Sequence, residues 1–167
     1  MSLIYKEAEA CDAEALLAHL KAVGKETDNL TFDSTTFNIS PEREARFIER
    51  FFRSDRDIMY IAKDGDTVVA NGIIEHGKIA RLSHKATLSI TVLKNRWGEG
   101  IGSHLMEMMI SHCRDKGTAV ISLECRSDNA RAIALYSKFG FKRIGVSERY
   151  FKINGSYASA DYMELLL

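Results

Sequence analysis

The spacing of apolar residues in the first part of the chain predicts one short strand and one helix. Residues 3–6 have a strand-like pattern, and from residue 12 the apolar positions recur at helical spacing as far as Val23. Gly24 is expected to end this helix as its C′ residue. The polar segment 25–38 that follows predicts no regular element.

A second helix is indicated by the residues that would begin it. Ser40 can cap a helix through its side chain, Pro41 suits the first helical position, and Glu42 places an acid near the positive end of the helix dipole. Apolar residues follow at helical spacing, so we expect them to form a buried face. These residues are Phe47, Ile48, Phe51 and Phe52.

Three strand-like segments come next, separated by short turns. Residues 57–63 lead to a turn at 64–66, and residues 67–76 lead to another near Gly77. In residues 83–93, apolar side chains alternate with threonine and serine, which is the period of a half-buried strand. The simplest arrangement is an antiparallel sheet in which these three strands are neighbours.

The rest of the chain predicts a helix, a strand, a helix and a hairpin. Helical spacing begins after Gly102, and residues 119–125 form a nearly continuous apolar run, which we expect to be a central strand buried on both faces. Residues 129–139 predict a helix that stops at Gly140. Two C-terminal strands are joined by Asn154-Gly155, a strong hairpin signal.

This order of elements predicts an α/β (α+β) fold, with a mixed, mostly antiparallel central sheet of about seven strands flanked by about four helices. The strand–helix–strand unit between Thr87 and Cys125 should be parallel and right-handed. No repeat, low-complexity segment or long run of like charge divides the chain. We therefore expect a single domain over residues 1–167.

Composition narrows the classes of protein that the chain can represent. Lys and Arg number 23, as do Asp and Glu, and this balance argues against a surface built for nucleic acid or an anionic membrane. No apolar run approaches the roughly 18 residues of a membrane span, and the N-terminal residues lack the pattern of a secretory signal. The 3 cysteines form no C-x-x-C pair. We expect a cytoplasmic protein without a disulfide scaffold or a metal site.

A glycine-rich segment lies where the third of the neighbouring strands passes into a helix. Glycines at 98, 100 and 102 permit unusual dihedral angles and a close approach of a ligand to the backbone. The amides that open the next helix have no intrahelical partner, so the turn suits phosphate, although a tight turn alone would need the same glycines. The motif G-x-x-x-x-G-K-S/T is absent, and Ser103 stands where a dinucleotide fingerprint needs glycine.

A second motif follows the apolar run and completes the pattern. The signature N-x-x-A-x-x-L-Y-x-x-x-G-F is matched by Asn129, Ala132, Leu135, Tyr136, Gly140 and Phe141. Gly100 and Gly102 match the glycines of Q/R-x-x-G-x-G/A. With both motifs in order and a strand between them, most of the chain resembles the GNAT superfamily of acetyl-CoA-dependent N-acetyltransferases. Trp97 departs from the pattern, because the family usually has Gln or Arg there.

The resemblance implies where acetyl-CoA, the co-substrate, would bind. The pyrophosphate would lie on the loop formed by Trp97, Gly98, Glu99, Gly100, Ile101, Gly102 and Ser103. The pantetheine arm would contact the preceding strand at Ile90, Thr91 and Val92, together with Asn129 and Tyr136. Backbone amides can still hold pyrophosphate without the usual Gln or Arg, whose side-chain contact is lost here or replaced by indole packing.

The resemblance also implies catalytic roles. Acetyl transfer needs a donor for the carbonyl oxygen, an acid for the thiolate and a base for the amine. The Ile90 N–H would be the donor and the Tyr136 phenol the acid. Some relatives have a Glu on this strand as base, but the matching residue is Ala86. Glu124, in an L-E-C-R segment similar to the L-E-V-R of ribosomal-protein alanine acetyltransferases, is the first candidate. The alternatives are His84, Glu26 and Glu75.

Two functions follow from this reasoning, and a third, a nucleotide-binding oxidoreductase, is disfavoured by the incomplete dinucleotide fingerprint. The first is an N-acetyltransferase that moves an acetyl group directly to a primary amine in a ternary complex, the acceptor being a small molecule such as an amino acid or its analogue, or a protein N-terminus. The second is a non-catalytic acyl-CoA-binding or sensing module. Segment 26–37, the second helix and the C-terminal hairpin should form the acceptor pocket. We expect no nucleic-acid or membrane partner, and the resemblance is compatible with a homodimer.

Overall fold

A central sheet of seven strands organises the fold in the computed structural model, which describes residues 3–167. The strands are β1 (Ile4–Glu7), β2 (Ile58–Asp64), β3 (Thr67–His76), β4 (Lys85–Val92), β5 (Val120–Arg126), β6 (Lys142–Ile153) and β7 (Ser156–Leu166). They lie in the order β1-β2-β3-β4-β5-β7-β6. Only β4 and β5 are parallel among these neighbours. The predicted mixed, mostly antiparallel sheet is confirmed.

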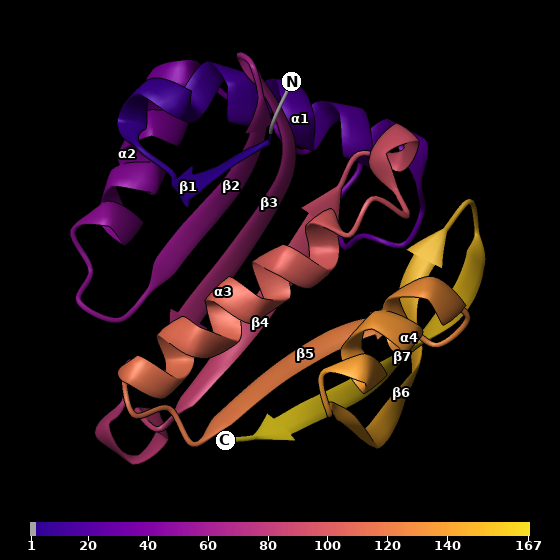
Figure 1. The fold of residues 1–167 in the computed structure, drawn as a ribbon. Coiled ribbons are helices and arrows are strands. Elements are labelled where there is room, and N and C mark those ends of the chain that lie inside the picture. The colour runs from indigo at the N-terminus through magenta and orange to yellow at the C-terminus, as the bar shows by residue number, and fades with distance from the viewer. Residues whose placement is uncertain (1–2) are drawn as a thin grey trace.

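Helices cover both faces of this sheet, as Figure 1 shows. The four α-helices within residues 3–167 are α1 (Ala13–Glu26), α2 (Pro41–Phe52), α3 (Ile101–Asp115) and α4 (Ala130–Lys138). Short 3₁₀ turns are η1 (Ala10–Asp12), η2 (Ala80–Leu82) and η3 (Lys94–Arg96). The predicted number and order of helices are confirmed. None of the helices described is long and apolar enough to cross a membrane.

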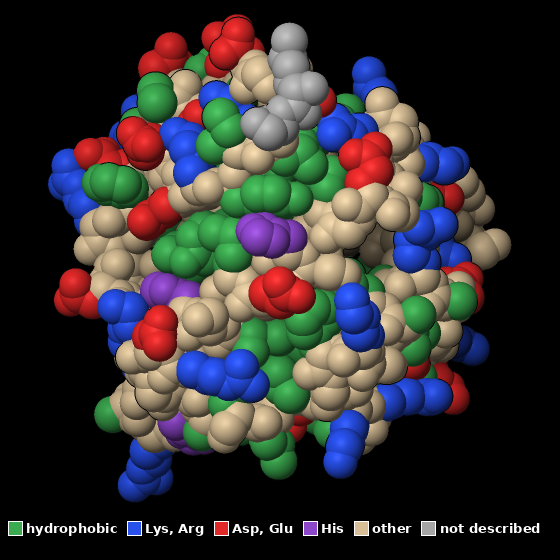
Figure 2. Space-filling model, in the orientation of Figure 1, with side chains coloured by type: hydrophobic (Ala, Val, Ile, Leu, Met, Phe, Trp, Pro, Cys, Tyr) green, Lys and Arg blue, Asp and Glu red, His purple; other side chains and the backbone are tan. Residues whose placement is uncertain are grey.

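Each face of the sheet has its own hydrophobic core, because side chains alternate along the strands. On one face, Met59 and Ile61 of β2 pack with the buried residues of α1 and α2. On the other, Ile58 and Ala62 belong to the core that includes α3 and Tyr136 of α4. On the face seen in Figure 2, basic and acidic side chains are interspersed among apolar ones.

The end of α1 differs from the prediction. The helix continues through Gly24 to Glu26, so Gly24 is not its C′ residue. A Cβ atom on Gly24 would lie 2.7 Å from the carbonyl carbon of Asp33. Glycine at this position therefore permits the loop after α1 to return close against the helix, which is a tertiary contact that helical spacing does not reveal.

The buried face of α2 is rotated from the one predicted. Ser40 caps the helix as expected, accepting a hydrogen bond from the Arg43 N–H. Ile48 and Phe51 are buried, whereas Phe47 and Phe52 are 39% and 55% exposed, so their predicted burial is wrong. Glu44, one turn before Ile48, takes the remaining buried position on this face.

The apolar run at 119–125 forms β5, but the strand is not buried on both faces. Its residues alternate, with Leu123 and Cys125 buried and Glu124 exposed. The helices of the Glu124 face, α1 and α2, pack over β2 and β3 and leave this part of β5 uncovered. The C-terminal hairpin is formed as predicted, and Asn154 and Gly155 have the positive φ angles, 49° and 81°, of its turn.

Candidate active site

Strands β4 and β5 pair only where they begin. Their register joins Lys85, Ala86 and Thr87 to Val120, Ile121 and Ser122. Beyond these pairs the strands diverge, and a cavity of about 1100 Å³ includes residues of both strands in its lining. The gap between β4 and β5 is therefore an opening inside the sheet, with both helical layers close to it.

Two backbone N–H groups of β4 face this gap. The Leu93 N–H donates to the Val69 carbonyl oxygen of the β3 side at 3.0 Å. Backbone groups along an antiparallel ladder point alternately toward and away from the partner strand. The N–H groups of Val92 and Ile90 therefore point away from β3, into the space that β5 has left. Thr91 points its backbone groups toward β3 instead.

The glycine-rich loop brings the open end of α3 to the same gap. Gly98 and Gly100 have φ angles of 87° and 81°, in the left-handed region that favours glycine. Gly100 is the N-cap of α3, and no side chain caps the helix. The first helical bond runs from the His104 N–H to the Gly100 carbonyl oxygen, so the amides of residues 101–103 are left for an external acceptor.

The charges around this loop favour an anion. Arg96 is neutralised by Glu99 and Asp64, at 2.9 Å from each. Two cations of α4 remain, because Arg131 and Lys138 form no ion pair with the residues described, and Lys138 Nζ lies 3.5 Å from Ser103 Oγ. Unpaired cations beside free helix amides suit a phosphate group.

Trp97 packs inside the glycine-rich loop, between β4 and α4. Its indole Nε1–H donates to the Val92 carbonyl oxygen at 2.9 Å, and the Arg131 guanidinium lies 4.9 Å from the ring centroid. The residue that replaces the family's Gln or Arg thus packs between β4 and α4. It also occupies a carbonyl that would otherwise be open to a ligand in the gap.

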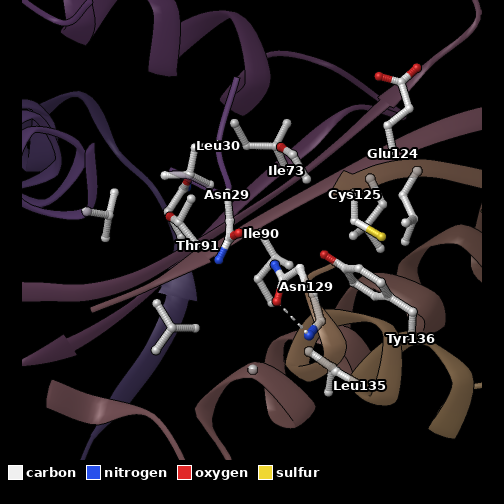
Figure 3. A pocket seen from close by; sticks show the side chains of 18 of the residues that line it. Asn29, Leu30, Ile73, Ile90, Thr91, Glu124, Cys125, Asn129, Leu135 and Tyr136 are labelled. Carbon is white, nitrogen blue, oxygen red and sulfur yellow. Dashed lines mark hydrogen bonds between the residues drawn. The ribbon is translucent and has the colours of Figure 1, made fainter. Parts of the chain in front are cut away.

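Helix α4 directs two polar side chains toward the cavity (Figure 3). Asn129 caps the helix by accepting a hydrogen bond from the Ala132 N–H at 3.2 Å, which leaves its amide NH₂ group for the cavity. Tyr136 is buried among the core residues, and Figure 3 shows its hydroxyl pointing past Cys125 into the cavity. Burial raises the pKa of Tyr136, so its phenol stays protonated at neutral pH.

Glu124 lies on the opposite face of β5 from Cys125, and its carboxylate points away from Tyr136 (Figure 3). It lines the cavity and accepts a hydrogen bond from the Tyr150 hydroxyl of β6. That hydrogen bond is the main cause that raises the pKa of Tyr150 to about 12, because it stabilises the neutral phenol. No sequence pattern pointed to Tyr150.

The alternative base candidates have other surroundings. Glu26 accepts a hydrogen bond from the Lys94 N–H at 2.8 Å, and Glu75 pairs with Arg50 at 3.0 Å. His84 precedes the paired beginning of β4, far along the strand from the glycine-rich loop. Among the residues described, none of these three lines the cavity, whereas Glu124 does.

Sequence reasoning also missed Glu44, which is 3% exposed and lines the cavity. Helical spacing could have found it, because residues 44, 48 and 51 lie on one face of a helix. The lining includes Thr27, residues 29–32 and Phe47 of α2, together with Phe151 and Tyr162 of the C-terminal hairpin. The three regions expected to form an acceptor pocket therefore meet at one cavity.

The mixed sheet, with its glycine-rich turn before α3, has the fold of a GNAT-family acetyltransferase. The Acetyltransferase (GNAT) family profile matches residues 24–141. This segment is most of the chain, and the chain belongs to the GNAT family.

Individual relatives agree with this assignment. The chain is 41% identical over 103 residues to the L-amino acid N-acetyltransferase AaaT of Escherichia coli, covering 60% of this chain and 62% of the relative. It is 34% identical to the N-alpha-acetyltransferase RimI of Mycobacterium tuberculosis, covering 58% and 60%. The crystal structure of a GNAT-family acetyltransferase from Streptococcus pneumoniae superimposes with a TM-score of 0.95 at 29% identity, over 99% of this chain and 100% of the other.

Proposed function

We propose that the protein transfers the acetyl group of acetyl-CoA directly to a primary amine in a ternary complex. The acceptor is a small molecule such as an amino acid or its analogue, or a protein N-terminus. One observation carries the proposal: the N–H groups of Ile90 and Val92 face a gap whose lining also includes the open end of α3 and Tyr136.

The residues along the gap fit the parts of acetyl-CoA in order. The amides of residues 98–103 and the cations of Arg131 and Lys138 would hold the pyrophosphate. The Val92 N–H and the Asn129 amide would hydrogen-bond to the pantetheine arm, which is extended and carries amide groups of its own. Because Trp97 occupies the Val92 carbonyl, the strand offers the arm one acceptor fewer.

Three groups would then divide the chemistry. The Ile90 N–H donates to the thioester carbonyl oxygen as negative charge develops there. Glu124 takes the proton of the attacking amine through a water molecule, since a neutral amine is needed for attack. Tyr136 hydrogen-bonds to the sulfur and gives it a proton as the carbon–sulfur bond breaks and the carbon–nitrogen bond forms. The raised pKa of Tyr136 keeps the phenol ready as a donor.

The positions of Glu124 and Tyr136 support a direct transfer. The two side chains lie on opposite faces of β5, so the amine can attack the thioester carbon from the side of Glu124 while the leaving sulfur faces Tyr136 on the other side. Cys125 lies beside Tyr136, but burial raises the pKa of its thiol to about 11, which makes it a poor nucleophile at neutral pH. No acyl-cysteine step is needed.

The test measures thiol release from acetyl-CoA over a panel of primary amines, with CoA binding followed separately by calorimetry. We expect CoA to bind and at least one class of amine to release thiol. Binding without thiol release from any amine or N-terminal peptide would replace the proposal by the acyl-CoA-sensing module. Failure to bind CoA would overturn both.

A further inference from the structure

Glu44 of α2 is a buried carboxylate without a partner. It is 3% exposed and lines the cavity, yet among residues 3–167 the structure gives its carboxylate no hydrogen bond and no ion pair. Burial alone raises its pKa. A buried carboxylate in a protein is normally paired, because the loss of hydration is otherwise not offset. An unpaired one that faces a cavity points to a partner outside the chain.

The other carboxylates that line the cavity already have partners. Glu164 pairs with Lys85 at 3.0 Å, and Glu124 accepts the hydrogen bond of Tyr150. Lys85 itself lines the cavity, but its ammonium is held by Glu164. Glu44 is therefore the carboxylate of the described lining that is free to pair with a ligand.

The aromatic residues that line the cavity on the α2 side of the sheet suit a cation. Phe32 and Phe37 line the same cavity and contact each other edge to face, with ring centroids 4.8 Å apart. Phe47, one turn along α2, also lines it. Aromatic faces attract ammonium and guanidinium groups, and an apolar wall strengthens the attraction of a carboxylate for them.

Glu44 lies on the face of the sheet that also carries Glu124, opposite the face of Tyr136. Helix α2 covers one face of the sheet, whereas α4, which carries Tyr136, lies on the other, and the cavity joins the two sides through the gap between β4 and β5 (Figure 1). A cation at Glu44 would thus lie on the same side of the sheet as Glu124, and it would belong to a part of the acceptor other than the amine that attacks near Ile90.

We propose that the acceptor is dibasic: a small primary amine whose remote end carries an ammonium or guanidinium group that pairs with Glu44. This inference rests on the proposed acetyl transfer and narrows its substrate class. A diamine and a basic amino acid share this chemistry. A peptide that begins with a basic residue presents the same groups, and the experiment separates it from the free amines.

The experiment compares kcat/KM for α,ω-diamines with that for alkylamines of equal length, in the unsubstituted protein and in Glu44→Gln. We expect the protein to favour the diamine by about tenfold or more, the usual effect of one charge-assisted hydrogen bond. The preference should fall to about twofold or less in Glu44→Gln and be partly kept in Glu44→Asp. Glu49→Gln, which removes an exposed carboxylate from the same helix, is the matched control and should keep the preference.

A dipeptide pair, Lys-Ala against norleucine-Ala, shows whether a peptide N-terminus is used in the same way. Equal kcat/KM for diamines and alkylamines, or a preference that survives Glu44→Gln, would overturn the inference while leaving acetyl transfer intact. If no amine is acetylated, the proposed function fails instead. In that case, calorimetry measures how tightly a diamine binds to the complex with CoA. If Glu44 pairs with the diamine, its affinity should fall about tenfold in Glu44→Gln.

Discussion

The Tyr150 phenol donates a hydrogen bond to the Glu124 carboxylate. Tyr150 belongs to β6 and Glu124 to β5, so the bond reaches across β7, where Tyr162 stands opposite Glu124 and meets the Tyr150 ring edge to face. Arg149, with a φ angle of 54°, lies where the register of β6 against β7 is interrupted, next to Tyr150. The irregular strand thus brings to Glu124 a partner that orients its carboxylate.

Loss of this partner should slow catalysis without weakening co-substrate binding. Tyr150→Phe removes the donor and leaves Glu124 free to rotate, so we expect kcat to fall by about three- to tenfold with KM for acetyl-CoA nearly unchanged. We expect Glu124→Gln alone to lower kcat by about 100-fold, and adding Tyr150→Phe to that variant should lower kcat little further. Steady-state kinetics check this, with Tyr157→Phe in the same hairpin as control. Equal losses in both backgrounds would contradict it.

The phenol of Tyr136 should matter for turnover and little for folding. Tyr136→Phe removes the proposed acid, so kcat should drop by about 100-fold or more. No hydrogen bond of this hydroxyl to the described residues is lost, so the free energy of unfolding should change by less than about 1 kcal/mol. Steady-state kinetics measure the first effect and urea unfolding the second. Full turnover in the variant would remove Tyr136 from the chemistry.

The loop should be sensitive to a side chain at Gly100. Alanine there must adopt a φ angle of 81°, which costs about 1 kcal/mol of stability or displaces the first amides of α3. We expect CoA affinity in Gly100→Ala to fall by about tenfold, measured by calorimetry. Gly145→Ala is the control, because a Cβ atom on Gly145 meets open space at an ordinary φ angle. Unchanged CoA affinity in Gly100→Ala would argue against phosphate binding by this turn.

His19 should make the protein less stable in acid. It is buried in α1, where Nε2 lies 2.8 Å from Thr91 Oγ1, and burial lowers its pKa from 6.5 to about 4. Between pH 6.5 and about 4, His19 is protonated in the unfolded chain but stays neutral in the folded protein. The free energy of unfolding should therefore fall by up to about 3 kcal/mol between these two values.

Urea unfolding of the protein and of His19→Gln across this pH range isolates the effect, because other groups that titrate in acid are common to both proteins. The pKa values of Asp12 and Asp57 are lowered by hydrogen bonds and ion pairs that offset the effect of burial, and these carboxylates also cost stability as they are protonated. The acid loss should be smaller in His19→Gln. Parallel curves for the two proteins would show that His19 does not carry it.

Glu44 should have the opposite effect on stability from His19. Its pKa is raised in the folded protein, so the folded state is disfavoured as pH rises above 4.5, where the unfolded chain ionises freely. Glu44→Gln removes this loss and should be more stable than the parent protein near neutral pH, by about 1 kcal/mol. The advantage should shrink in acid. Thermal unfolding of both proteins near neutral pH and near pH 4 checks the direction of this stability difference. A Glu44→Gln variant that is less stable than the parent at neutral pH would contradict the prediction.

The sequence carries the local features of this fold better than the contacts between its elements. Periodicity located the strands and helices, and the cap at Ser40 and the turn at Asn154-Gly155 were predicted from residue chemistry alone. Gly24 and Phe47 were misjudged because their surroundings depend on a loop and a helix that pack from elsewhere in the chain. Local patterns do not report such contacts.

The same limit applies to the site. The glycine-rich loop, Asn129 and Tyr136 belong to contiguous motifs and were predicted as a set that meets at one cavity. The divergence of β4 from β5, the hydrogen bond from Tyr150 and the isolation of Glu44 arise from tertiary packing. None of them has a signature in the order of residues, except the helical position of Glu44.

Because β4 and β5 separate after their first residues, the sheet has an unpaired strand edge in its interior as well as at its two ends. Outer edges are blunted by charges, bulges or prolines, but the inner rim of β4 exposes bare main-chain donors beside a hydrophobic interior. A ligand that pairs with these donors between β4 and β5 would resemble a strand: it would be thin, elongated and rich in amide groups. The pairing of β4 with β5 would therefore favour the amide-containing arm of the proposed co-substrate before any side chain contributes.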